Sequence, residues 1–107
     1  MALEKLKLTG KTIHIGLKDP IVDACVGDVL SVNPRGEYSP TDGVITQVYH
    51  SSVHVFARSF KGREGIFTYA TNGLGIMPGM QLCCDDEDRD HYNSLLREAG
   101  IEIPGEF

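Results

Sequence analysis

The sequence contains few cysteines and no long apolar run. Its three cysteines, Cys25, Cys83 and Cys84, are an odd and sparse set, unlike the disulfide framework of a small secreted domain. No 18 apolar residues stand together, as a membrane-spanning helix would require. The first eight residues carry charges where a signal peptide needs an apolar core. We therefore expect a soluble chain in a reducing cytoplasm.

Patterns that mark common active sites are also missing. The chain has no recognisable strained nucleophile turn, phosphate-cradling loop or pair of carboxylates. Gly73-Leu74-Gly75 lacks the third glycine and the following helix of a dinucleotide motif. His50, Ser51 and Ser52 are neighbours in sequence, but nothing in their spacing builds a catalytic arrangement. We expect no enzyme activity and no cofactor.

Two weak metal patterns are present and both are incomplete. His50 and His54 lie in a turn and a strand, and the adjacent cysteines at 83–84 lack the two-residue spacer of a zinc knuckle. Alternate aspartates in residues 86–90 match the first ligands of a calcium loop, but the glycine is missing and Arg97 takes the place of the bidentate glutamate. We expect no metal site.

Negative charge is unevenly distributed along the 107 residues. The formal net charge is −5, yet residues 1–84 hold eight Lys or Arg against seven Asp or Glu, and residues 85–107 hold two against eight. The acidity therefore belongs to the C-terminal part. A near-neutral body can still carry a basic patch, so the total charge does not exclude a nucleic-acid partner.

Short β-strands separated by glycine and proline turns dominate the first 84 residues. Alternating apolar positions on both sides of Thr9-Gly10 predict a β-hairpin over residues 3–15, with a helix over residues 2–8 as the alternative. Further strands are predicted within residues 26–34, 44–49, 53–58, 66–69 and 76–84, with a long exposed loop over residues 35–43 and a turn at Pro78-Gly79. In the strand predicted at residues 53–58, Val53, Val55 and Ala57 share one face, and His54, Phe56 and Arg58 share the other.

The C-terminal part predicts one amphipathic helix. Asp85 offers a cap, the acidic residues after it suit the positive end of the helix dipole, and Gly100 supplies the stop. Tyr92, Leu95, Leu96 and Ala99 form one apolar stripe. We expect a single domain over residues 1–107, mainly β: a small, bent, SH3-like barrel or sandwich of six or seven short strands (1–84), closed by the acidic helix and a docked tail (85–107).

With no catalytic pattern, we expect a non-catalytic binding module that contacts another protein through its loops and acidic helix, as an inhibitor or adaptor. A carboxylate cluster can meet a basic protein surface and can imitate nucleic-acid phosphate. The candidate protein-binding residues are Asp85, Asp86, Glu87, Asp88 and Asp90.

Three alternatives stay open. A basic aromatic turn could bind nucleic acid by pairing phosphates and stacking a base; its residues are Arg58, Phe60, Lys61 and Arg63, extended by Arg35 and Tyr38. A small ligand could bind between the long loop and Tyr49 or Tyr69. A homodimer could form through an edge strand at Leu3–Leu8.

Overall fold

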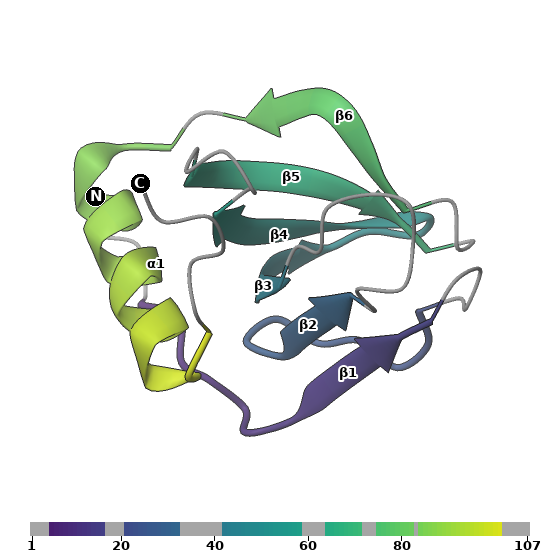
Figure 1. The fold of residues 1–107 in the computed structure, drawn as a ribbon, viewed down its shortest axis with the longest axis horizontal. Coiled ribbons are helices and arrows are strands. Elements are labelled where there is room, and N and C mark those ends of the chain that lie inside the picture. Colours follow the sequence, from purple (N-terminus) through teal and green to yellow (C-terminus); the bar gives the residue numbers. More distant parts are fainter. Residues whose placement is uncertain are drawn as a thin grey trace.

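The computed structural model describes residues 5–16, 21–32, 42–58, 64–71, 75–82 and 84–101. They form six strands and one helix, as Figure 1 shows. The elements are β1 (Thr12–Ile15), β2 (Val29–Val32), β3 (Asp42–Val48), β4 (Ser52–Arg58), β5 (Glu64–Ala70), β6 (Gly75–Leu82) and α1 (Asp86–Glu98). The chain is mainly β with one C-terminal helix, as predicted.

The strands form one mixed sheet that is bent but open. They lie in chain order, β1-β2-β3-β4-β5-β6; β1 pairs with β2 in parallel and every other pair is antiparallel. The bend brings Ile21, after β1, to Thr71, after β5: the Ile21 amide donates to the Thr71 carbonyl at 3.2 Å. Among the described strands no pairing joins β1 to β6, which lie at opposite edges in Figure 1. The sheet is therefore not closed into a barrel, so the barrel alternative of the predicted bent barrel or sandwich is wrong.

The faces of β4 hold two separate apolar clusters, because side chains alternate along a strand. Val53, Val55 and Ala57 are fully buried in a cluster that includes Leu30 and Tyr69. Phe56 is fully buried on the other face, where α1 covers it. The predicted division of this strand into two faces is confirmed.

The predicted hairpin at residues 3–15 is wrong. Residues 5–9 are neither strand nor helix, and β1 pairs in parallel with the distant β2, in a register that places Thr12 opposite Val29. Leu6 and Leu8 instead pack beside α1 against the cluster around Phe56. This long-range contact, rather than a local turn, buries part of their apolar surface. An alternation of two residues in the sequence cannot reveal such a contact.

A strand runs through the predicted turn at Pro78-Gly79. The pairing of β5 with β6 shifts there, because Phe67 lies opposite Gln81 and Tyr69 lies opposite Ile76. Four β6 residues therefore face the single residue Thr68. Proline has no N–H to donate to a neighbouring strand. It is tolerated here because β6 is an edge strand and because the register shift leaves this position without a ladder hydrogen bond.

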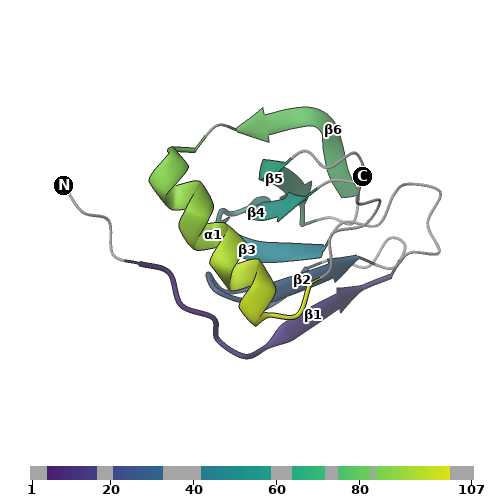
Figure 2. The same cartoon turned by 60° about the vertical axis from the view of Figure 1, so that its left-hand side comes forward.

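The helix α1 is confirmed with nearly its predicted ends. It begins after Asp85, whose backbone is extended and whose side chain makes no capping hydrogen bond, and it ends before Gly100, which has a φ of +77°. Leu95 and Leu96 are buried and contact the cluster of Val44 and Phe56. Figure 2 shows α1 lying across the sheet, with the segment before β1 beside it.

The described chain is compact. Its radius of gyration is 12.7 Å, close to the ~13 Å expected of a globular chain of this length. Within the described residues no helix is long and apolar enough to cross a membrane.

Candidate functional site

The first two turns of α1 carry the acidic cluster, and most of it faces solvent. Asp85, Asp86, Glu87 and Asp90 are exposed, whereas Asp88 is half-buried. The opposite side of the same helix is held against the sheet by its buried leucines. The carboxylates are thus presented on a fixed support, in the place where the sequence predicts them.

One arginine partly neutralises this cluster. Arg89 forms an ion pair with Asp86 at 3.0 Å, and its Nε lies 3.5 Å from Glu64 Oε1 on β5. Asp85, Glu87 and Asp90 form no ion pair with any residue that the structure describes. Three carboxylates therefore remain available to an outside cation.

The acidic cluster also affects two neighbouring groups. Burial, followed by the negative charge of Asp88, raises the pKa of Tyr92 above its ordinary value. Burial likewise raises the pKa of the Cys84 thiol, although the charge of Arg89 acts against this. Cys84 lies between β6 and α1, not in the last strand as predicted, and it packs against the Phe56 cluster. Neither group is ionised near neutral pH.

Arg58, the first residue of the predicted basic turn, is held inside the fold. Its Nε donates to Glu64 Oε2 at 3.1 Å and to Asn93 Oδ1 at 3.2 Å, and 23% of its side chain is exposed. The guanidinium therefore joins β4 to β5 and α1. This structural role was not apparent from the sequence, since both partners come from other elements.

The other predicted nucleic-acid residues lie outside the described part of the chain. They are Arg35, Tyr38, Phe60, Lys61 and Arg63. Of the two tyrosines considered for a small ligand, Tyr49 is exposed and Tyr69 is buried in the sheet cluster. Tyr49 instead contacts the His54 ring edge-on, with the ring centres 4.7 Å apart. Burial lowers the pKa of His54.

Metal-ligating side chains do not gather within the described residues. No group of three His, Cys, Asp or Glu in that part of the chain could hold a metal ion. Cys83 lies outside it. The His54 ring packs against the ring of Tyr49.

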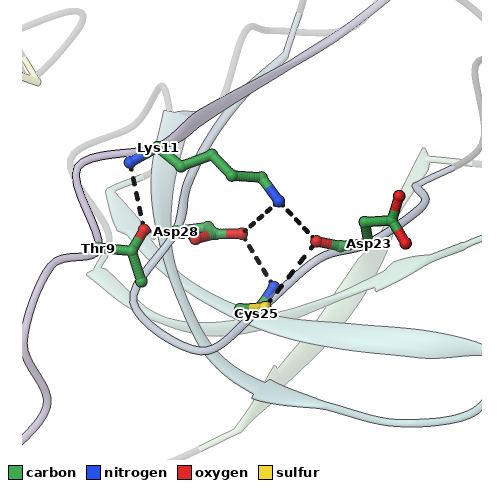
Figure 3. Close-up of polar contacts among 5 residues, drawn as sticks. All are labelled: Thr9, Lys11, Asp23, Cys25 and Asp28. Atoms are coloured by element: carbon green, nitrogen blue, oxygen red, sulfur yellow. Dashed lines mark hydrogen bonds and ion pairs between the residues drawn. The ribbon is translucent and has the colours of Figure 1, made fainter.

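A buried carboxylate, which the sequence did not single out, organises the N-terminal half. Asp28 is 1% exposed, and Figure 3 shows it between Lys11 and the turn at Cys25. Its Oδ1 accepts a hydrogen bond from the Thr9 hydroxyl, and its Oδ2 accepts one from the Cys25 amide at 2.9 Å. Lys11 Nζ lies 3.5 Å from Oδ2 and donates to the Asp23 carbonyl at 2.6 Å.

These contacts join three segments at one point. The Thr9 amide also donates to the Gly27 carbonyl at 3.1 Å, and the Gly27 amide donates to the Ile45 carbonyl at 2.9 Å. Gly27 has a φ of +95°, and a Cβ there would lie 2.2 Å from the Lys7 carbonyl oxygen. Only glycine fits this position without movement of the backbone.

The Asp28 centre is a structural support. Both carboxylate oxygens are engaged, and no described buried side-chain nitrogen or oxygen lacks a hydrogen-bond partner. A reacting group would need a free oxygen and space beside it. The Gly27-Asp28 pair was recognised in the sequence only as a turn, because its partners Thr9 and Lys11 lie far away along the chain.

Comparisons of this chain with protein-family models, with curated proteins and with solved structures find no match.

Proposed function

We propose that this chain is a non-catalytic binding module that contacts a basic surface of another protein through the first two turns of α1. The observation that carries the proposal is the set of three exposed carboxylates, Asp85, Glu87 and Asp90, which have no ion pair among the described residues. They stand on a helix whose other side is packed on the sheet.

The physical basis is electrostatic complementarity. Like charges held close together on a rigid element attract a surface of opposite sign and orient it during encounter. The carboxylates also stabilise the helix, because they lie at the positive end of its dipole. Stabilisation of the helix dipole depends on where the charges lie along the helix. The same outward-facing carboxylates can therefore also contact a partner protein.

The test is to capture proteins from a native lysate with the tagged chain, with and without nuclease treatment, at low and at high salt. The variant Asp85→Asn, Glu87→Gln, Asp90→Asn should retain about tenfold less of the captured protein than the parent chain, since each exposed pair contributes about 0.2 to 1 kcal/mol. High salt should produce a similar loss in the parent chain.

The matched control also removes three negative charges, but from later positions in the sequence. It combines Glu98→Gln, Glu102→Gln and Glu106→Gln. It should bind like the parent chain. Equal losses in both variants would mean that only net charge matters and would contradict a site on α1. Loss of all captured protein on nuclease treatment would instead favour the turn at residues 58–63.

A further inference from the structure

The outer side of β1 presents backbone groups that nothing described here pairs. Thr12 lies opposite Val29, and the Val29 amide donates to the Lys11 carbonyl at 3.0 Å. In a parallel ladder this arrangement turns the amide and carbonyl of Thr12 and of His14 away from β2. Both residues are exposed, and no described residue bonds to these outward groups.

The other edge of the sheet is less suited to pairing. β6 contains Pro78, which has no N–H, and its register shifts at residues 77–80. β1 has no proline, no bulge and no formal charge within its four residues, which are the devices that normally protect an edge strand. Its short length is the one protection it has.

We propose that β1 pairs with β1 of a second copy of this chain, antiparallel, and joins the two sheets into one. This inference is independent of the proposed role of α1. A two-fold axis at Ile13 would place Thr12 of each copy opposite His14 of the other. Because the amide and carbonyl of both residues point outward, the two pairs form four backbone hydrogen bonds.

The side chains of β1 favour this partner. Ile13 is half-buried beside the sheet cluster and Ile15 is buried in it, whereas Thr12 and His14 are exposed. The two-fold axis keeps the isoleucines of both copies on one face and brings the two Ile13 side chains into contact. The nearest formal charge, that of Lys11, is paired with Asp28 of its own copy and does not oppose the approach.

Four hydrogen bonds and one isoleucine pair make a weak dimer, so the association should depend on concentration. The variant His14→Pro removes an outward N–H that the β1-β2 ladder does not use, and thereby two of the four bonds. We expect the dissociation constant to rise by about tenfold or more, as measured by sedimentation velocity. His14→Ala keeps the N–H and is expected to dimerise like the parent chain.

Amide hydrogen exchange of the parent chain gives a readout that needs no variant. Exchange at Thr12 and His14 should slow as the protein concentration rises, whereas exchange at Ser94, on the exposed side of α1, should not change. A chain that stays monomeric at millimolar concentration would overturn the proposal. So would a dimer in which these two amides exchange at the monomer rate, or one that His14→Pro leaves intact while His14→Ala disrupts it.

Discussion

At the scale of single residues, the Asp28 carboxylate is buried and has contacts on both of its oxygens. A buried charge is stable only where hydrogen bonds and an opposite charge replace water. Thr9 and Lys11, from the segment before β1, and the Cys25 amide, from the turn before β2, supply these contacts. Asp28 therefore holds the N-terminal segment, β1 and the turn before β2 together.

Asp28→Ala should lower the free energy of unfolding by about 1 to 3 kcal/mol, because it removes the acceptor of two part-buried hydrogen bonds and the charged partner of Lys11. Asp28→Asn keeps one acceptor oxygen and should cost less. Urea denaturation followed by circular dichroism measures both. Asp90→Asn, which removes an exposed carboxylate, serves as the control and should change stability by no more than about 0.5 kcal/mol. An alanine variant as stable as this control would show that the Asp28 contacts contribute nothing.

At the scale of elements, α1 is attached to the sheet by apolar and polar contacts of different origin. Leu95 and Leu96 contribute buried apolar surface, and the rings of Tyr92 and Phe56 lie 5.0 Å apart. Arg58 adds a directed hydrogen bond from β4 to Asn93 on the helix. The apolar contacts are non-directional, whereas the hydrogen bond to Asn93 and the ion pair between Arg89 and Glu64 are directional and favour one position of the helix on the sheet.

A double-mutant cycle with Arg58→Ala and Asn93→Ala should show a coupling energy of about 1 kcal/mol, since the two side chains share a hydrogen bond. The measurement is the free energy of unfolding of the four proteins. Arg58→Ala combined with Asp90→Ala provides the comparison pair on the same helix, for which the coupling should be near zero. Equal coupling in both cycles would contradict a specific bond between Arg58 and Asn93.

At the scale of the whole molecule, the shifted pKa values of His54, Cys84 and Tyr92 make stability depend on pH. Burial lowers the pKa of His54 from its ordinary 6.5. The unfolded chain then binds a proton more readily than the folded chain, so this contribution to stability is complete above pH 6.5 and is lost as the pH falls below it. Burial raises the pKa of Tyr92 above its ordinary 10.0. Stability from Tyr92 is therefore present below pH 10 and falls as the pH rises above it.

His54→Gln should flatten the stability profile between pH 5 and pH 7, because it removes a group that protonates more easily in the unfolded chain. Thermal unfolding at several pH values measures the profile. Ser94→Ala, which removes no titratable group from an exposed position on α1, should leave the slope as it is in the parent chain. An NMR titration that places the pKa of His54 at or above 6.5 would contradict the assignment.

The sequence by itself determined several local elements, among them β4 and α1, and the position of the acidic cluster. The alternating faces of β4 depend on residues within a few positions of one another. The same is true of the acidic start and the glycine stop of α1, so a local pattern is sufficient to predict both elements. It also located the exposed carboxylates of the candidate site, since side-chain type and helix position are both local properties.

Only the tertiary structure decided how these elements meet. The parallel pairing of β1 with β2, the open edge of the sheet, the engagement of Arg58 by Glu64 and Asn93, and the burial of Asp28 all join residues distant in sequence. Leu6 and Leu8 suit a hairpin strand by their spacing, yet they cover a cluster that α1 completes. Local spacing specifies which side chains need burial, whereas the surface that buries them exists only after the whole chain has folded.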